Sequence, residues 1–320
     1  MQPGLVSVII PTYNRGHLVG DAIRSVLAQD YAPKQIIVVD DGSTDETRRI
    51  VAGFAGVEYH YQANQGQAAA RNAGLRHSRG EYVASLDSDD IWDPTFLTAG
   101  IDQLPPERSI VFMNWRTSNG NKGLESFFRR AAVRRRYLTR ALGSWWHLDA
   151  AQTRRMVLEI CPAPSSALII RRSAMPGGWN EQMRIADDWC LLLDIVLHRP
   201  TAAAFTMAPH WLKRVQGDNI YDGRSHTALA QELSAHDEPL LLRRHQDQLS
   251  RSEIAIFQQQ QAEHYVNYAY TSYKHSEKNA MLRHMLAAFR LAPLATGCCI
   301  VREVATYVKT HYSNRYAHSA

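Results

Sequence analysis

A cluster of acidic residues follows the apolar segment "GEYVASL" at residues 80–86. Asp87, Asp89 and Asp90 occur within four positions, directly after residues that suit a buried strand. Carboxylates this close repel one another, which is costly unless a cation lies among them. Mg²⁺ and Mn²⁺ prefer oxygen ligands and commonly bind one or two carboxylates together with phosphate oxygens. The pattern fits a divalent-cation site that serves a polyphosphate, but for these residues alone a solvated acidic turn that caps the next helix is the favoured interpretation.

The segments around this cluster alternate between strand and helix patterns, which predicts an α/β fold with parallel strand pairing. Ligands of such sheets bind beyond the carboxyl ends of the strands. Asp40 and Asp41 should therefore meet the acids of 87–90 at one edge. The strand patterns lie at 6–10, 35–40, 57–61 and 81–87, and the helix patterns at 18–27, 41–54 and 66–78.

The later part of the chain has a different character. After a looser stretch at 105–160, a strand pattern at 165–172 and a helix pattern at 186–198 follow. From about residue 225 onward the composition becomes helical. We expect an α/β domain over residues 1–224 and a helical C-terminal extension over residues 225–320.

Composition excludes several classes of protein. The 320 residues are 45% hydrophobic and 21% charged, as in globular proteins and unlike disordered chains. No stretch approaches the roughly 18 to 20 apolar residues of a membrane span, and the N-terminus has no basic segment typical of a signal peptide. The four cysteines show no CxxC spacing, which favours free thiols in a reducing compartment. We therefore expect a cytoplasmic protein.

Charge is distributed unevenly along the chain. Residues 1–128 carry 11 Lys and Arg against 15 Asp and Glu, whereas residues 129–320 carry 25 against 16. Nucleic-acid binding is not expected, because the half with the acidic cluster is negative and no recognition motif is visible. The segment 129–146 reads as a basic amphipathic helix, which can lie peripherally at the inner face of a membrane. The alternative is an ordinary packed helix.

Four further stretches stand out: "PTYNR" (11–15), "VVDDGSTD" (38–45), "NQGQAAARNAGLRHSRGEYVASLDSDD" (64–90) and "CPAPSSALIIRRSAMPGGWNEQMRIADDWCLLL" (161–193). Together they resemble the family 2 glycosyltransferases, which are nucleotide-sugar enzymes of the GT-A fold with a mixed, mostly parallel central sheet. The resemblance extends over roughly residues 5–220. It implies a metal-dependent inverting enzyme that moves a sugar from a nucleoside diphosphate, with UDP favoured, to a hydroxyl of a glycan or lipid-linked acceptor. Bacterial surface polysaccharide assembly would be a typical setting.

The resemblance assigns the nucleotide to two loops near the start of the chain. Pro11, Thr12 and Tyr13 would contact the base and the ribose. Asp40 and Asp41 would receive the base, since an ionised carboxylate can accept a hydrogen bond from an imide N–H.

The same resemblance assigns the diphosphate and the cation. Arg71 would reach a phosphate, because a guanidinium matches oxyanion geometry; the alternative is a surface arginine. Asp89 would contact Mn²⁺ or Mg²⁺ directly, with Asp90 as the second metal residue. Asp87, Ser88 and Asp90 would hold ribose, sugar or metal-bound water.

Asp188 is the implied catalytic base, which would deprotonate the acceptor hydroxyl on the face of the sugar opposite the leaving diphosphate. Asp187 would orient the sugar or cap the helix. The alternative is that both acids only favour a helix N-terminus.

One motif departs from the family pattern. Residues 214–216 read Arg-Val-Gln, where many members have Arg-x-His, and an amide is a poor metal ligand. Arg214 remains available to hold phosphate. A catalytically degenerate scaffold protein of the same fold is therefore the rival hypothesis. A dinucleotide-dependent oxidoreductase is disfavoured, because Pro-Thr-Tyr-Asn stands where its glycine fingerprint would be.

Overall fold

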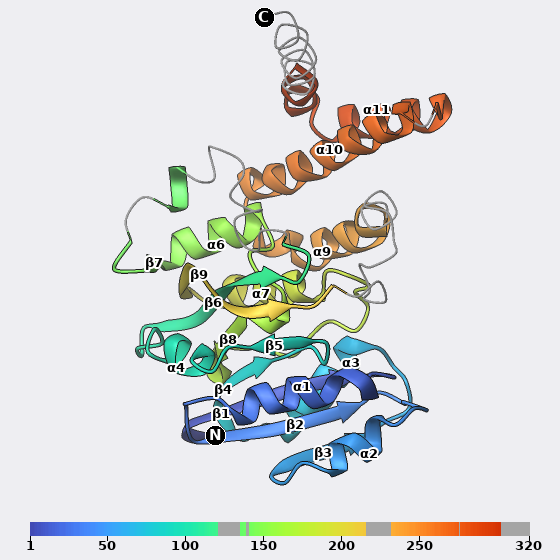
Figure 1. The fold of residues 1–320 in the computed structure, drawn as a ribbon. Helices are drawn as coiled ribbons and strands as arrows, with labels where there is room; N and C mark the ends of the chain where they lie inside the picture. Colours follow the sequence, from blue (N-terminus) through green and yellow to red (C-terminus); the bar gives the residue numbers. More distant parts are fainter. Residues whose placement is uncertain (121–134, 139–140, 216–231, 275, 302–320) are drawn as a thin grey trace, which may run out of the picture. The chain divides into compact units, whose positions relative to one another are not determined.

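The computed structural model describes residues 1–120, 135–138, 141–215, 232–274 and 276–301. The chain divides into two compact units, Met1–Gly223 and Arg224–Ala320. Figure 1 shows the elements of both units coloured along the sequence.

A mixed sheet forms the centre of the first unit. Its strands are β1 (Gln2–Thr12), β2 (Lys34–Asp40), β3 (Val57–Tyr61), β4 (Gly80–Ser85), β5 (Asp90–Trp92), β6 (Arg108–Thr117), β7 (Trp145–Leu148), β8 (Leu168–Arg171) and β9 (Ala202–Lys213). Within the described residues the order is β3-β2-β1-β4-β8-β6-β9-β5, and β7 pairs with β9. The strands β1 to β4 pair in parallel, whereas β8 runs antiparallel to both β4 and β6.

Parallel pairing brings the ends of the first strands to one edge. Thr12 of β1 pairs with Asp40 of β2, which pairs with Tyr61 of β3. Next to them, Ser85 at the end of β4 pairs with Ile9. The loops after β1, β2 and β4 therefore share this edge, as the strand patterns predict.

The helices of the first unit cover the sheet and its edges. They are α1 (Gly16–Leu27), α2 (Thr47–Ala52), α3 (Gln67–His77), α4 (Phe96–Ile101), α6 (Ala150–Glu159) and α7 (Asp187–His198), with short 3-10 turns at η2 (Ser165–Ala167) and η3 (Arg172–Ala174). The helix α3 lies close to β1, since a Cβ on Gly74 would come within 2.4 Å of the Ile9 side chain. This glycine permits the close approach of the helix to the sheet.

The second unit is helical. Its elements include the π-helical turn η4 (Leu233–Asp237), α9 (Glu238–His245), the 3-10 turn η5 (Gln246–Gln248), α10 (Arg251–Lys274) and α11 (Lys278–Leu291), and the described residues 293–301 are also helical. Its core contains Ala262, Val266, Ala288 and Cys299. Among the helices that the structure describes, none has the length and apolar character needed to cross a membrane.

The helix expected over residues 129–146 is not observed as such. Residues 129–134 and 139–140 lie outside the described part of the chain, so a membrane-facing helix there stays a prediction. Trp145 and Trp146, however, belong to β7, where Trp145 pairs with Thr206 of β9. A single helix that runs through residue 146 is therefore wrong, because the tryptophans are extended and hydrogen-bonded into the sheet.

Candidate active site

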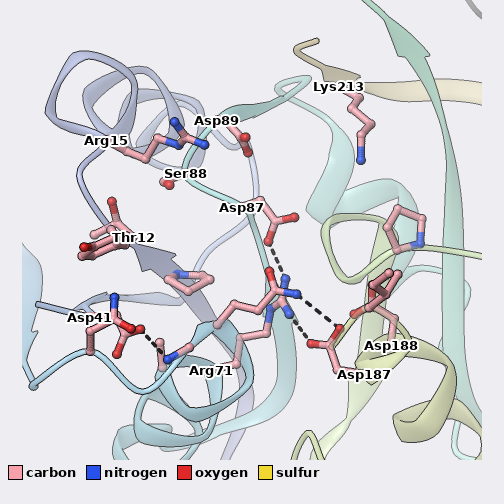
Figure 2. Close-up of a pocket in the computed structure, with 18 residues that line it drawn as sticks. Thr12, Arg15, Asp41, Arg71, Asp87, Ser88, Asp89, Asp187, Asp188 and Lys213 are labelled. Carbon is pink, nitrogen blue, oxygen red and sulfur yellow. Dashed lines mark hydrogen bonds and ion pairs between the residues drawn. The ribbon is translucent and has the colours of Figure 1, made fainter. Parts of the chain in front are cut away.

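A cavity of about 430 Å³ opens at the sheet edge where β1, β2 and β4 end. Figure 2 shows the 18 residues that line it. Most of the site residues predicted from the sequence are among them: Pro11, Thr12, Tyr13, Asp41, Arg71, Asp87, Ser88, Asp89, Asp187 and Asp188.

One wall of the cavity consists of the loops after β1 and β2, which are joined to each other by hydrogen bonds. The backbone N–H of Asn14 donates to Ser43 Oγ at 2.8 Å, and Asn14 Oδ1 accepts from the backbone N–H of Thr44 at 2.8 Å. The buried hydroxyl of Thr12 has no hydrogen-bond partner within the described residues. A buried polar atom of this kind is costly until it finds a partner. Its position in the cavity lining fits a polar group of a ligand.

Asp41 shapes the cavity through the loop that precedes α3. Its carboxylate accepts hydrogen bonds from the side chain of Gln62 at 2.7 Å and from the backbone N–H groups of Gln65 and Gly66 at 2.9 and 2.7 Å. The carboxylate is thus held in one orientation at the cavity wall.

Asp40 does not reach the cavity. Its side chain is buried and accepts from the hydroxyl of Tyr59 at 2.6 Å and from the backbone N–H of Ser43 at 2.8 Å. Of the two adjacent acids predicted to receive the base, only Asp41 is at the cavity.

The acidic cluster after β4 fits a divalent cation. Asp87, Asp89 and Asp90 each offer a carboxylate oxygen, and these oxygens lie within 4.8 Å of one another. Burial, reinforced by Asp87, raises the pKa of Asp89 to about 6 and the pKa of Asp90 well above the ordinary value. The negative charges of these carboxylates are unfavourable without a cation, and their oxygens are the ligands that Mn²⁺ and Mg²⁺ prefer. Asp90 does not line the cavity, and its Oδ2 accepts from Ser166 Oγ at 2.8 Å.

Arg71 links the two acidic groups of the site. Its guanidinium is buried, and it donates to Asp187 Oδ2 at 2.5 Å and to Asp87 Oδ1 at 2.7 Å. Although burial opposes the charge, Asp87 and Asp187 raise the pKa of Arg71. The alternative of a surface arginine is therefore excluded. Each terminal nitrogen bonds a carboxylate, so Arg71 positions these acids, while its Nε has no hydrogen-bond partner among the described residues.

Asp187 and Asp188 lie in the first turn of α7 on the other side of the cavity. Burial raises the pKa of Asp187 to about 7, although Arg71 opposes the shift. Burial also raises the pKa of Asp188, whose Oδ1 accepts a hydrogen bond from Ser165 Oγ. A carboxylate with a raised pKa suits proton abstraction near neutral pH. Asp188 and Asp89 line the same cavity.

Arg214 has a different place from the one predicted. Its Nε donates to the backbone oxygen of Asp89 at 2.5 Å, and its Nη1 donates to Asp21 Oδ2 at 2.8 Å. It is not part of the cavity lining, so a phosphate contact is not supported. Gln216, which replaces the family histidine, lies outside the described residues.

Two basic residues at the cavity were not singled out from the sequence. Arg15 follows β1 and Lys213 ends β9. Burial raises the pKa of Asp89, and both of these side chains partly oppose that rise because they favour the charged form. Arg15 stands in the quoted "PTYNR" motif, so a signal existed. The pairing of β9 with β5 brings Lys213 next to Asp90, and the sequence analysis did not predict β9. The other lining residues that were not predicted are Asn64, Gly66, Gln67, Ala70, Pro164 and Ile185.

Comparison with known proteins decides the family. The model of "Glycosyl transferase family 2" matches residues 7–173, more than half of the chain, and this region contains the acidic cluster and Arg71. The chain belongs to glycosyl transferase family 2. The family predicted from the motifs is confirmed.

Curated relatives of this family 2 member match over part of their length. WfgD of Escherichia coli, named a UDP-Glc:alpha-D-GlcNAc-diphosphoundecaprenol beta-1,3-glucosyltransferase, is 37% identical over 131 residues, which cover 40% of this chain and 52% of WfgD. TuaG of Bacillus subtilis, named a putative teichuronic acid biosynthesis glycosyltransferase, is 40% identical over 113 residues, or 34% of this chain and 44% of TuaG. The match thus spans about half the length of these relatives or less.

Solved structures share the fold. Residues 1–349 of Staphylococcus aureus TarS, in complex with UDP-GlcNAc, match with a TM-score of 0.55 and 16% identity, covering 90% of this chain and 92% of TarS 1–349. The mannosyltransferase PcManGT from Pyrobaculum calidifontis, in complex with GDP-Man and Mn²⁺, matches with a TM-score of 0.58 and 19% identity, covering 97% and 82%. The α/β GT-A fold with a mixed, mostly parallel sheet and C-terminal helices is confirmed.

Proposed function

We propose that this family 2 member transfers a sugar, with inversion, from a nucleoside diphosphate to a hydroxyl of a glycan or lipid-linked acceptor. One observation carries the proposal: Asp87 and Asp89 of the acidic cluster after β4 line the same cavity as Asp188 on α7. The names of WfgD and of the TarS complex favour UDP as the nucleotide. The name of WfgD also supports a diphospholipid-linked acceptor, and the name of TuaG supports a role in polysaccharide biosynthesis.

The proposed donor site extends along the cavity. Thr12, Tyr13 and Asp41 hold the base and ribose, in line with the unpartnered Thr12 hydroxyl and the fixed Asp41 carboxylate. Arg15 and Lys213 are the cations offered to the diphosphate.

The proposed cation site consists of Asp87, Asp89 and Asp90, with Ser88 beside them at the cavity wall. Mn²⁺ or Mg²⁺ bound there would neutralise charge on the diphosphate.

In the proposed reaction, the carboxylate of Asp188 accepts the proton of the acceptor hydroxyl. The hydroxyl oxygen forms a bond to the anomeric carbon while the bond from that carbon to the diphosphate oxygen breaks, and the diphosphate leaves with the electron pair. Attack from the side opposite the leaving group inverts the configuration. Arg71 holds Asp187 beside Asp188, and Asp187 is thereby available to orient the sugar.

The test is donor turnover across a panel of UDP-glucose, UDP-GlcNAc, UDP-galactose and GDP-mannose. Release of the nucleoside diphosphate is measured with MnCl₂, with MgCl₂ and with EDTA, with and without a glycan acceptor. We expect metal-dependent release, and we expect Asp188→Asn to lower kcat by roughly 10²- to 10⁴-fold, the usual contribution of a general base.

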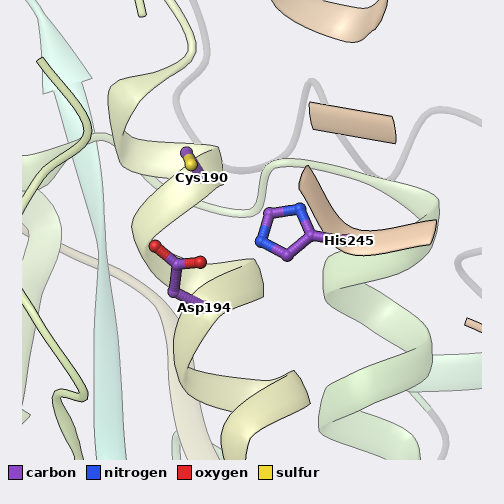
Figure 3. A group of neighbouring side chains, drawn as sticks. All are labelled: Cys190, Asp194 and His245. Carbon is purple, nitrogen blue, oxygen red and sulfur yellow. The ribbon is translucent and has the colours of Figure 1, made fainter. Parts of the chain in front are cut away.

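Asp194→Asn is the matched control. Asp194 lies on the same helix as Asp188, next to Cys190 in Figure 3, but it does not line the cavity. Its variant should retain wild-type turnover. Binding of UDP without metal-dependent turnover of any donor would instead support the rival scaffold protein.

We also propose that residues 1–224 form the catalytic domain and residues 225–320 a helical extension, since every residue that lines the cavity lies in Met1–Gly223. With a lipid-linked acceptor, we propose peripheral contact with the inner face of a membrane.

A further inference from the structure

Two adjacent serines contact both acidic groups of the site. Ser165 and Ser166 form most of the turn η2 and are buried. Ser165 Oγ donates to Asp188 Oδ1, while Ser166 Oγ donates to Asp90 Oδ2 at 2.8 Å. One short turn thus bonds the proposed base and one carboxylate of the acidic cluster.

The direction of β8 explains why this turn lies there. Because β8 runs antiparallel to β4, it enters the sheet at the edge where β4 ends, as the pairing of Ala84 with Ile169 shows. The residues before β8 therefore lie beside the residues after β4. The backbone N–H of Asp87 accordingly donates to Ser166 Oγ at 3.1 Å.

Each serine hydroxyl has its direction set by a donor on its other side. A hydroxyl carries one hydrogen and accepts through its lone pairs. Trp179 Nε1 donates to Ser165 Oγ at 3.0 Å, so the hydroxyl hydrogen of Ser165 is left for Asp188. In the same way the Asp87 N–H leaves the hydrogen of Ser166 for Asp90.

The turn is itself anchored by two tryptophans. Trp92 Nε1 donates to the backbone oxygen of Ser166 at 2.8 Å. The backbone of Trp179 is bonded through both its N–H and its oxygen to the amide of Asn72, each at 2.8 Å. Gly178 permits this contact, because a Cβ there would lie 2.0 Å from Asn72 Oδ1. The indole that directs Ser165 is thus fixed to α3.

We propose that the Ser165–Ser166 pair is a positioning element that fixes the base Asp188 and the cation-binding acids relative to each other. Ser165 bonds Oδ1 of Asp188, and in the proposal Oδ2 accepts the proton. Ser166 holds Asp90 and the backbone of Asp87 in the cation site. The inference rests on the proposed function, and it predicts that the two serines affect different steps.

The experiment compares Ser165→Ala, Ser166→Ala and the control Ser85→Ala. Ser85 is a buried serine of β4 whose hydroxyl has no partner among the described residues, so its removal costs no hydrogen bond. The measurements are kcat and KM on the UDP-sugar turned over by the wild type, UDP affinity by calorimetry, and Mn²⁺ affinity by the electron paramagnetic resonance signal of free Mn²⁺.

We expect a split between catalysis and binding. Loss of a hydrogen bond to a charged group should lower the kcat of Ser165→Ala by about 10- to 100-fold, with UDP and Mn²⁺ affinity unchanged. Ser166→Ala should weaken Mn²⁺ binding by about tenfold, including in the absence of any sugar donor. Ser85→Ala should match the wild type in every measurement.

A second variant covers the case in which Ser165→Ala misfolds. Trp179→Phe keeps an aromatic ring but removes the N–H, so the Ser165 hydroxyl is free to turn. Its kcat should fall less than that of Ser165→Ala, and the double variant should be no slower than Ser165→Ala alone, because both changes act on one bond.

The outcomes separate the two proposals. If the wild type is active and the kcat of Ser165→Ala or Trp179→Phe stays near the wild-type value, the positioning role of the serine pair is overturned. The proposed function would then remain intact. Additive losses in the double variant, or equal losses of kcat and Mn²⁺ affinity in both serine variants, would also overturn it. A wild type that turns over no donor would overturn the function, and the positioning role with it.

Discussion

Asp89 shows how one side chain depends on its surroundings. Its backbone oxygen is held by Arg214, and its carboxylate lies among other acids at the cavity. Burial raises its pKa to about 6, above the value of 3.8 for an ordinary aspartate. The charged form is therefore less favourable in the folded protein than in the unfolded chain, and either a proton or a cation can relieve this cost.

This leads to a prediction on pH and metal. A carboxyl whose folded pKa is raised costs stability above that pKa, and the cost is lost as pH falls from about 6 toward 3.8. At pH 7.5, Mn²⁺ should increase the free energy of unfolding relative to EDTA by on the order of 1–3 kcal/mol, and so raise the melting temperature. At pH 5 the shift should be smaller, because protons compete for the same oxygens.

Thermal unfolding at the two pH values, with MnCl₂ and with EDTA, measures the effect. Asp89→Asn should abolish the Mn²⁺ shift and make metal-free stability less dependent on pH between 5 and 7.5. An equal shift at both pH values would contradict the proposed cation site.

At the scale of elements, packing of α3 on β1 supports the site. The helix carries Arg71, which bonds the acids, and Gly74, which faces Ile9. A displacement of α3 from the sheet would therefore also displace the guanidinium from Asp87 and Asp187.

We expect Gly74→Ala to destabilise the protein by about 1–3 kcal/mol. Alanine favours a helix by up to about 1 kcal/mol, but the added methyl must displace Ile9 in the core. Urea unfolding measures the difference. Gly177→Ala is the control, since nothing lies within 4 Å of a Cβ there, and it should be nearly neutral. A stabilised Gly74→Ala protein would show that α3 can shift at no cost.

At the scale of the whole molecule, charge is distributed unevenly along the chain. The cavity lies in Met1–Gly223, and most of its acids come from the first 128 residues, which are net negative. Residues 129–320 carry the excess of Lys and Arg. Basic segments attract anionic lipid in a salt-dependent way, which would suit the lipid-linked acceptor that we propose.

We expect co-sedimentation with vesicles that contain phosphatidylglycerol, and less with neutral phosphatidylcholine vesicles or at high salt. The double change Arg129→Glu with Arg140→Glu should weaken binding by about tenfold or more, since each basic residue near the surface contributes about 1 kcal/mol. The control, Arg48→Glu with Arg49→Glu, makes the same charge change on α2. Equal weakening by both pairs would indicate that net charge alone, and not the 129–146 segment, governs binding.

The sequence by itself determined the α/β alternation, the family and the edge of the sheet at which the site lies. These follow from local patterns: apolar runs buried on both faces, and acids placed directly after strands. The later strands β5, β6, β7 and β9 were missed. β5 and β7 have only 3 and 4 residues, and β9 contains a proline, so these segments carry no clear period. The apolar run of β6 at residues 110–113 was a usable signal.

Only the tertiary structure decided between neighbours in the chain. The cavity is lined by Asp41 but not by Asp40, and by Lys213 but not by Arg214. Successive side chains of extended backbone point to opposite sides, so a shift of one residue exchanges a buried contact for the cavity wall. That choice depends on pairing between distant strands, as does the contact of Ser165 with Asp188, and no local pattern records it.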